Sequence, residues 1–275
     1  MSGLSRIGWF SFAGVKVTNL DFNLNTPKLV SVDRPSSPKM TYNTFTAPKR
    51  NGASYYKNRY EDLYIKVTIG VHGTQQERQQ KITNLLQQWI GREDRLIFAD
   101  RPNLFYKARF FDSVSTKDSG TFTEITISFI ASYCMYELHS DLRDHVVNDL
   151  TMILDDLGAL VCRATWQGIT SYTTKTITNS GNFESQPLIE LTGAATLITL
   201  EVNNKEFSIA NLNGTIFIDT ENMNVYKMNG DKKVSVLPQF QGQFPTIAPG
   251  ENNVFIGGNS LNVDITIDFK NTYIV

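Results

Sequence analysis

The chain has 275 residues, of which 41% are hydrophobic and 19% are charged, and its formal net charge is −1. This length and apolar content predict one large or two ordinary domains with packed cores. A nearly neutral chain has no overall electrostatic attraction to nucleic acid or to an anionic membrane, so we expect neither partner.

The cysteines and the N-terminus bear on the compartment. Cys134 and Cys162 lie among apolar neighbours, which predicts buried free thiols rather than a disulfide framework. Residues 1–11 lack the apolar core of a secretion signal, and no segment approaches the ~20 apolar residues of a membrane helix. We therefore expect synthesis and folding in a cytoplasm.

The first predicted element is a strand and turn at Gly8–Gly14, and a long polar segment follows at Leu29–Tyr60. This segment combines prolines, basic residues and aromatics without a periodicity that would pack it on its own core. Two interpretations remain open: a surface loop, or an extended arm that lies on a neighbouring subunit, because long unstructured loops are uncommon in compact domains. The candidate interface residues of such an arm are Arg34, Pro35, Pro38, Lys49, Arg50, Tyr55 and Tyr56.

Regular elements follow the polar segment. Leu63–Val71 alternates between apolar and polar residues and is predicted as a strand. A helix is predicted to begin after Thr74, which forms a capping box with Glu77, and to end at Gly91. Its apolar stripe is Ile82, Leu85, Leu86, Trp89 and Ile90. Further strands are predicted at Arg95–Asp100, Tyr106–Phe110 and Phe122–Ile130, the last with Ile125, Ile127 and Phe129 facing inward.

Residues 136–161 are predicted to connect an N-terminal domain (1–135, including the arm at 29–60) to a C-terminal domain (162–275). A helical period predicts a connecting helix, with Gly158 near its end. The apolar residues at that period are Leu142, Val146, Leu150, Ile153, Leu154 and Leu157.

The C-terminal third consists of short alternating segments separated by turn residues. In Asn262–Phe269, every second residue is apolar, which indicates a half-buried strand. Hairpin turns are predicted at three pairs: Asn213-Gly214, Asn229-Gly230 and Gly257-Gly258. The predicted fold is mainly β with one or two helices: an N-terminal sheet or split barrel with a packed helix, then an antiparallel β-sandwich.

No catalytic constellation is evident. The chain has no Gly-rich phosphate loop, no HExxH, no CxxC and no GxSxG, and its three histidines are not spaced as metal ligands. The acidic pair Asp155-Asp156 is interpreted as part of a solvated face, since adjacent helical acids point in different directions. We therefore expect no enzyme activity, no cofactor and no metal site.

Aromatic residues of the predicted sandwich allow a second interpretation. Exposed aromatic rings can stack on sugar rings, and the candidates are Trp166, Tyr172 and Tyr226. The favoured alternative is that these rings fill the core of the sandwich.

Two collinear sets of residues resemble siphophage distal tail proteins. The C-terminal set is Gly181, Asn182, Pro187, Ile189, Gly193, Gly214, Ile218, Asp219, Val225, Tyr226, Gly230, Phe244, Pro245, Pro249, Gly250, Glu251 and Asn252. The N-terminal set is Leu86, Trp89, Gly91, Leu96, Phe98, Asp100, Pro102, Tyr106, Ala108 and Arg109. Together they span nearly the whole chain.

This resemblance implies a structural hub rather than an enzyme. The N-terminal domain would form a homohexameric ring at the virion tail tip, and the C-terminal domain would be a galectin-like or carbohydrate-binding-module-like sandwich. The implied partners are the tail tube protein, a tail-associated fibre-base protein, and receptor-binding or other baseplate proteins. The alternative function is a carbohydrate-binding module on a structural domain that attaches to host cell-surface glycans.

Overall fold

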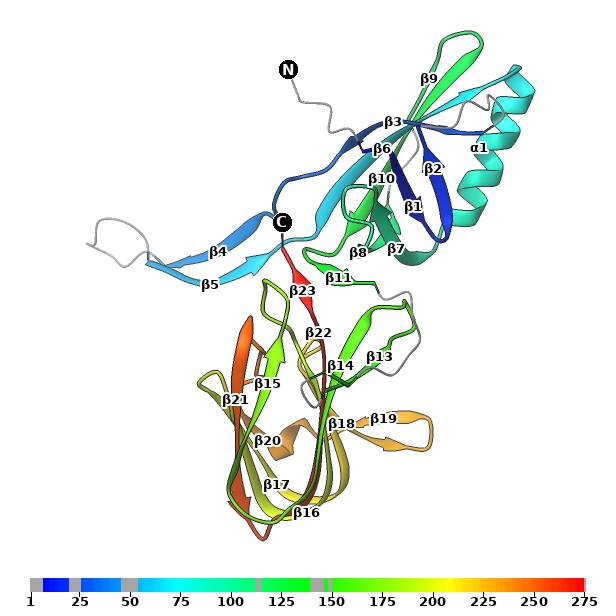
Figure 1. The fold of residues 1–275 in the computed structure, drawn as a ribbon. Coiled ribbons are helices and arrows are strands. Elements are labelled where there is room, and N and C mark those ends of the chain that lie inside the picture. The colour runs from blue at the N-terminus through cyan, green and yellow to red at the C-terminus, as the bar shows by residue number, and fades with distance from the viewer. Residues whose placement is uncertain are drawn as a thin grey trace. The chain divides into compact units, whose positions relative to one another are not determined.

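The computed structural model describes residues 7–19, 26–45, 54–111, 115–138, 146–147 and 150–274. The chain divides into two compact units: unit 1 comprises residues 1–136 and 274–275, and unit 2 comprises residues 137–273 (Figure 1). Strands dominate both units, and a single α-helix occurs among the described residues. The predicted mainly β fold class is confirmed.

Unit 1 is built on strands that close into a barrel. The barrel strands are β1 (Trp9–Phe12), β2 (Val15–Thr18), β3 (Lys28–Asp33), β6 (Leu63–His72), β7 (Glu93–Phe98), β8 (Leu104–Phe110) and β10 (Phe122–Ala131). They are hydrogen-bonded in the order β8-β7-β1-β2-β3-β6-β10, and β10 pairs again with β8, which closes the path. Two further strands, β9 (Ser115–Asp118) and β11 (Met135–Glu137), pair at the margin of this sheet.

The core of unit 1 is rich in aromatic rings. Trp89 is fully buried, and its ring contacts Phe10, Phe12 and Phe129 at centroid distances of 5.9 Å each. The predicted strands at 63–71 and 122–130 are confirmed as β6 and β10, whose inward residues are buried. Strict alternation therefore identified the inner face of the barrel from the sequence.

Helix α1 (Gln75–Trp89) covers unit 1 with its buried stripe. The predicted capping box is confirmed: the amide of Thr74 donates to Glu77 Oε2 at 2.8 Å, and the amide of Glu77 donates to Thr74 Oγ1 at 3.4 Å. Ile82, Leu85 and Trp89 are buried, as predicted. Leu86 is half-buried and Ile90 is 59% exposed instead, because at helical spacing both lie on the flank of the buried stripe.

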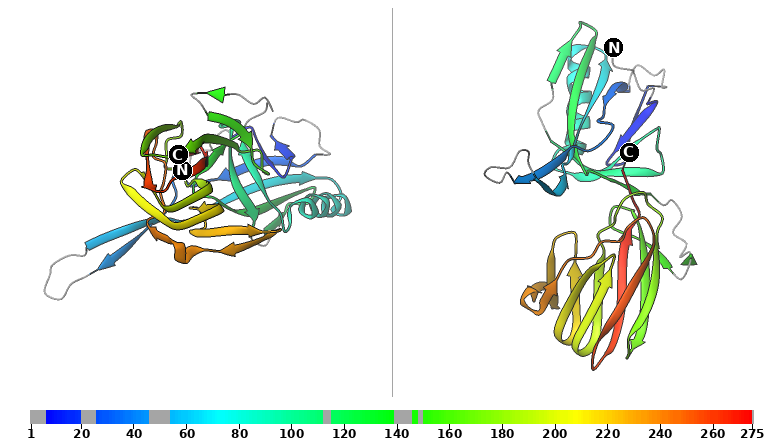
Figure 2. Two further views of the ribbon diagram at one scale, coloured as in Figure 1. Left: turned by 90° about the horizontal axis from the view of Figure 1, so that it is seen from below. Right: turned by 90° about the vertical axis from the view of Figure 1, so that its left-hand side faces the viewer.

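Unit 2 is an antiparallel structure of many strands (Figure 2). Its strands are β12 (Val146–Val147), β13 (Leu150–Leu154), β14 (Leu160–Ile169), β15 (Thr173–Asn179), β16 (Leu188–Val202), β17 (Lys205–Asp219), β18 (Asn224–Asn229), β19 (Lys232–Ser235), β20 (Phe240–Gly242), β21 (Gly250–Asn259), β22 (Asn262–Lys270) and β23 (Thr272–Tyr273). A short 3-10 helix, η1 (Leu237–Gln239), lies between β19 and β20.

The long hairpin of β16 and β17 joins two layers of unit 2. The first half of β16 pairs with β22 over Leu188–Ala194, and its second half pairs with β21 over Leu197–Val202. One layer therefore runs β13-β14-β22-β16-β17-β18-β19, and the other contains β15, β21 and β20. Gly193 lies near the change of partner, where a Cβ would stand 2.2 Å from the carbonyl oxygen of Asn262.

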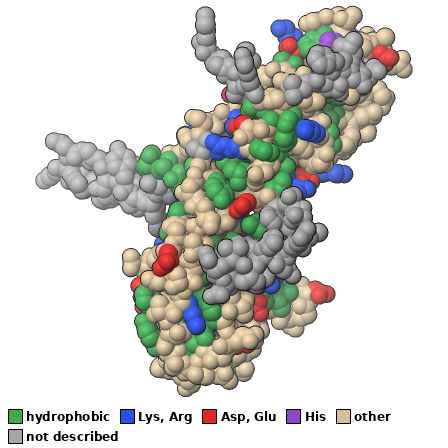
Figure 3. All heavy atoms as spheres, in the orientation of Figure 1, with side chains coloured by type: hydrophobic (Ala, Val, Ile, Leu, Met, Phe, Trp, Pro, Cys, Tyr) green, Lys and Arg blue, Asp and Glu red, His purple; other side chains and the backbone are tan. Residues whose placement is uncertain are grey.

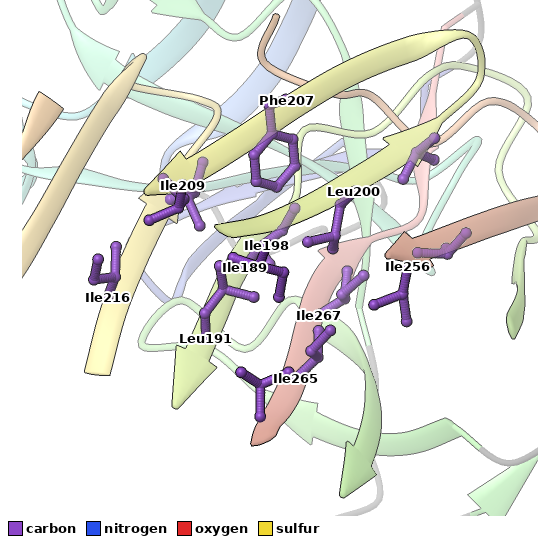
Figure 4. Packing of buried hydrophobic residues seen from close by; sticks show 14 of the residues in the cluster. Ile189, Leu191, Ile198, Leu200, Phe207, Ile209, Ile216, Ile256, Ile265 and Ile267 are labelled. Atoms are coloured by element: carbon purple, nitrogen blue, oxygen red, sulfur yellow. The ribbon is translucent and has the colours of Figure 1, made fainter. Parts of the chain in front are cut away.

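Aliphatic side chains from both layers fill the space between them (Figure 4). The predicted strand at 262–269 is confirmed as β22, and its inward residues Val263, Ile265, Ile267 and Phe269 are at most 2% exposed. They meet residues of β16 such as Ile189 and Leu200, which are fully buried. The core of unit 2 is thus mainly isoleucine and leucine.

The predicted connecting helix is wrong. Where its second half was expected, β13 pairs with β14 and belongs to the sheet of unit 2. The residues Asp155–Gly158 form the turn between these strands: Asp155 Oδ1 accepts hydrogen bonds from the amides of Leu157 and Ala159 at 2.9 and 2.7 Å. Asp155 also forms an ion pair with Lys270 at 2.6 Å, so it is a turn-forming residue rather than part of a solvated helix face. Leu142 lies outside the described residues.

Two of the three predicted hairpin turns are also wrong. Asn229-Gly230 does connect β18 to β19, with a positive φ of 59° at Gly230. Asn213-Gly214 lies within β17, opposite Gly193, and Gly257-Gly258 lies within β21. At Gly258 a Cβ would stand 2.1 Å from the carbonyl oxygen of Leu197, so this glycine permits the close approach of two strands rather than a turn.

Candidate assembly interface

A separate two-stranded hairpin extends from unit 1 within the segment predicted as an arm. Strand β4 (Met40–Phe45) pairs with β5 (Ser54–Tyr60), with Met40 opposite Tyr60 and Phe45 opposite Ser54. Among the described strands, β4 and β5 pair only with each other, so each presents one unpaired backbone edge (Figure 1). An edge of this kind can accept a strand from another chain.

The base of this hairpin is fixed to unit 1 by specific contacts. Glu61 forms an ion pair with Lys39 at 3.3 Å and accepts a hydrogen bond from the hydroxyl of Thr41. The bond from Thr41, followed by Lys39, holds the pKa of Glu61 below its usual value. The ring of Tyr60 stacks on Tyr133 with centroids 5.8 Å apart. The hairpin is therefore anchored where it leaves the barrel.

The residues predicted for the arm interface lie in different settings. Residues 28–33 at the start of the segment form β3 of the barrel rather than a projecting arm. Arg34 follows it and forms an ion pair with Asp100, and its guanidinium carbon lies 4.9 Å from the centre of the Phe98 ring. These contacts fix Arg34 within its own subunit.

The other candidates lie farther along the segment. Pro35 is exposed and Pro38 is half-buried. Tyr55 and Tyr56 belong to β5, opposite Thr44 and Asn43. Lys49 and Arg50 lie outside the described residues.

An exposed aromatic pair on the barrel wall escaped the sequence analysis. Tyr64 on β6 and Phe111 after β8 are 55% and 51% exposed, and their rings meet edge to face at 5.4 Å. Tyr64 stands opposite the half-buried Ile130 of β10. The available signal was the bulky ring of Tyr64 on the outward face of an otherwise regular amphipathic strand.

The three aromatic candidates for glycan stacking have different exposures. Tyr172 is 70% exposed in the turn between β14 and β15, where its ring passes close to Gly257. Trp166 is partly buried against the core of unit 2. Tyr226 is 6% exposed: its ring stacks on Phe217 at 5.3 Å, and Lys233 Nζ lies 4.4 Å from its centre. Only Tyr172 thus presents its ring to solvent.

Several residues that carry the family resemblance have backbone roles. Asn252 is 1% exposed; its Oδ1 accepts hydrogen bonds from the amide of Ala248 and from Asn203 Nδ2, at 2.8 and 2.7 Å. Its Nδ2 donates to the carbonyl oxygens of Ala248 and Gly250. At Gly181, a Cβ would stand 2.3 Å from the carbonyl oxygen of Thr272. These residues shape turns rather than a ligand site.

The ionisable groups described in unit 2 give no sign of an activated nucleophile. Burial raises the pKa of the Cys162 thiol to about 12, with a smaller contribution from Glu137, so this thiol is protonated at neutral pH. Among the described residues, no three His, Cys, Asp or Glu side chains are grouped to hold a metal ion. No helix in the described part of the chain is long and apolar enough to cross a membrane.

Comparison with known proteins places unit 1 in a family. Residues 15–131 match the model of the phage tail protein RIFT-related domain. Most of unit 1 therefore resembles a phage tail protein domain. This match confirms the predicted resemblance to siphophage distal tail proteins, since it covers the part of the chain assigned to their ring-forming domain. No match was found among curated protein sequences.

One solved structure shares the fold over almost the whole chain. The chain is similar to the Dit protein of phage SPP1, whose crystal structure is described as a paradigm of the hub adsorption apparatus in phages that infect Gram-positive bacteria. The TM-score is 0.61 at 15% sequence identity, and the alignment covers 96% of this chain and 98% of that one. A chain of the phage p2 baseplate in its activated conformation with Sr aligns over 94% of this chain and 97% of its own, with a TM-score of 0.42 and 9% identity.

Proposed function

We propose that this chain is a non-enzymatic hub of a siphophage tail tip. In this proposal unit 1 assembles into a homohexameric ring that continues the tail tube, and the galectin-like unit 2 carries baseplate or receptor-binding proteins. The partners are the tail tube protein on one side and a tail-associated fibre-base protein on the other. The match of unit 1 to a phage tail protein domain carries the proposal, and the similarity in fold to a hub protein over both units supports it.

The projecting hairpin gives the ring a physical basis. A closed ring needs two different surfaces that fit head to tail, and an unpaired strand edge is one such surface. The β4–β5 hairpin is anchored at Glu61 and Tyr60 but pairs with no other described strand. We therefore assign it as the arm that lies on the neighbouring subunit, with the Tyr64–Phe111 pair as an apolar contact on the barrel wall.

The test is to shorten the arm without disturbing its base. Residues 42–58 are replaced by Asn-Gly, which joins Thr41 and Arg59, two residues that face each other across the hairpin. Thr41 then still bonds Glu61. In mass photometry we expect the full chain to form particles near six times its 31.0 kDa mass. The shortened chain should remain at the mass of a monomer.

Thermal unfolding of the shortened chain serves as the folding control, because the deletion spares the barrel and unit 2. A shortened chain that still forms complete rings would exclude the hairpin as the ring contact. A full chain that stays monomeric over the whole concentration range, with no ring in electron micrographs, would contradict self-assembly.

A further inference from the structure

Exposed apolar side chains gather in one short part of unit 2. Among the exposed large hydrophobic residues, Met223, Met228, Val234 and Leu237 fall within 15 residues, at exposures of 66%, 45%, 47% and 42%. They belong to the β18–β19 hairpin, to the turn before it and to the 3-10 helix η1 after it. The hairpin stands off the side of unit 2 (Figures 1 and 2). Clustered exposed apolar residues in a soluble protein mark an interaction surface.

The hairpin also offers a free backbone edge. Strand β19 is the last strand of its layer, and its four residues are exposed. The amide of Val236 donates to the carbonyl of Val225 at 2.8 Å. This bond shows which opposed residues of the hairpin are hydrogen-bonded to each other and which are not. In an antiparallel pair every second residue directs its N–H and C=O away from the partner strand. On β19 these residues are Lys233 and Ser235, opposite Met228 and Tyr226.

A second edge strand provides a comparison. Strand β9 in unit 1 also has four exposed residues, but its sequence is Ser-Thr-Lys-Asp and contains no apolar side chain. Its Asp118 forms an ion pair with Arg78 at 3.0 Å, so it is occupied within the subunit. Polar and charged residues on an edge strand prevent pairing with other chains. Strand β19 reads Lys-Lys-Val-Ser, so its lysines oppose pairing with another basic strand, whereas Val234 and the exposed apolar residues around it leave contacts for a partner that neutralises those lysines.

The β18–β19 hairpin carries three lysines against one acidic residue, Asp231, in its turn, and this positive balance indicates which kind of partner it would bind. Lys232 and Lys233 are adjacent on β19, and Lys227 stands opposite Val234. The hairpin of a second copy would bring the same lysines together, and the arm at 29–60 is itself rich in Lys and Arg. Like charges oppose both contacts. Along β19, Lys232 and Val234 lie on one face and Lys233 and Ser235 on the other, so a strand beside it would meet a lysine on each face and a valine on one, which calls for acidic residues interleaved with apolar ones.

We propose that β19 is a docking edge for an extended segment of a partner protein, in which acidic and apolar residues alternate. The segment adds to the sheet of unit 2 as one further strand, with main-chain bonds to Lys233 and Ser235. Met223, Met228 and Leu237 provide adaptable apolar contacts on either side. The inference rests on the proposed function, since it assigns the contact through which unit 2 holds a baseplate component.

The probe is a capped nine-residue peptide of alternating Glu and Val, with a peptide of alternating Lys and Val as its control. Binding to the full chain is followed by fluorescence anisotropy, and hydrogen exchange locates it. We expect saturable binding of the acidic peptide, slower exchange at residues 232–235, and at least tenfold weaker binding of the basic peptide. K232E/K233E should reverse this preference, whereas K117E on β9 should leave it unchanged.

The backbone part of the proposal has its own variant. S235P removes an amide that faces away from β18, so the hairpin ladder stays intact while an outward donor is lost. We expect S235P to bind the acidic peptide about tenfold more weakly than S235A does. Equal binding by S235P and S235A, or equal binding of both peptides to the unmodified chain, would overturn the proposal.

The particle mass of every variant separates this proposal from the proposed function. Hairpin variants should form the same particles as the unmodified chain. Normal particles without peptide binding would refute the docking edge and leave the hub intact. Loss of particles in K232E/K233E or S235P would show instead that β19 contacts a second copy, which also overturns the proposal.

Discussion

Unit 1 and unit 2 are β structures of similar length, but different interactions fasten their strands. Unit 1 closes a barrel around the rings of Phe10, Phe12 and Trp89 and places ion pairs on its outside, such as Lys107–Glu93 at 3.0 Å. Unit 2 joins two aliphatic layers and buries amide side chains in its turns. Acidic and basic side chains are scattered over the visible face rather than gathered in one patch (Figure 3).

The difference suggests how each unit responds to its surroundings. Exposed ion pairs weaken with salt and with protonation, whereas a buried amide hydrogen bond depends on neither. Asn179, Asn252 and Asn271 of unit 2 are at most 3% exposed. Unit 2 also carries the ion pairs Arg163–Asp268 and Lys270–Asp155, so the contrast is one of degree. We expect the stability of unit 2 to depend less on salt and pH than the stability of unit 1 does.

The largest expected effect comes from a charge placed in the aliphatic core. Ile265 is fully buried on β22, and I265D would bury a carboxylate without a partner, which costs more than ~4 kcal/mol. Hydrogen exchange resolved along the sequence should show fast exchange throughout unit 2 and retained protection in unit 1. N262D adds the same charge to an exposed position of the strand and should have little effect. Equal loss of protection in both units would show that they do not fold independently.

A smaller effect is expected from removing one buried amide. N252A deletes four hydrogen bonds and leaves the backbone groups of Ala248 and Gly250 without their partner, at a cost of about 2–4 kcal/mol. Urea unfolding monitored in unit 2 measures the loss. Because no charge is involved, the loss should be the same at pH 5 and pH 8. The control N213A changes an exposed asparagine and should stay within ~0.5 kcal/mol of the unmodified chain. A loss that varies with pH would contradict the contrast between the units.

Local signals explain which parts of this fold were predictable. Strands β6, β10 and β22 and the cap at Thr74 are determined by residues next to one another in the sequence, and all were predicted. Strand β13 was not, because its leucines fit a helical period by spacing alone and its pairing with β14 decides the structure. Gly258 was misassigned because its role depends on Leu197, which is distant in the sequence.

The candidate interface was harder to predict, for the same reason. The sequence shows that Arg34 is basic and Tyr226 aromatic, but not that Asp100 and Phe98 surround the first or that Phe217 and Lys233 cover the second. Contacts between distant strands decide whether such a side chain is available to a partner. The turn between β18 and β19 was predicted, but the exposed apolar edge at β19 was missed, because a single valine among polar residues has no periodicity to identify it.

The smallest expected effect is a pH dependence confined to unit 1. Hydrogen bonding from Arg109, and then from Lys107, lowers the pKa of Glu93 below its usual value of 4.5. Because the folded pKa is the lower one, Glu93 stabilises the folded state above pH 4.5, and this contribution is lost as the pH falls through the folded pKa. The glutamate is 37% exposed, so the contribution at neutral pH is less than ~1 kcal/mol.

The variant E93Q removes this dependence. The unmodified chain should be slightly more stable than E93Q at pH 7, and the difference should shrink as the pH falls through the folded pKa. Chemical unfolding of unit 1, followed by hydrogen exchange, measures the difference across this range. The control E251Q changes an exposed glutamate of unit 2 and should leave the unfolding of unit 1 unchanged at every pH. A constant difference between E93Q and the unmodified chain from pH 7 to pH 3 would mean that packing of the side chain, rather than its charge, is responsible.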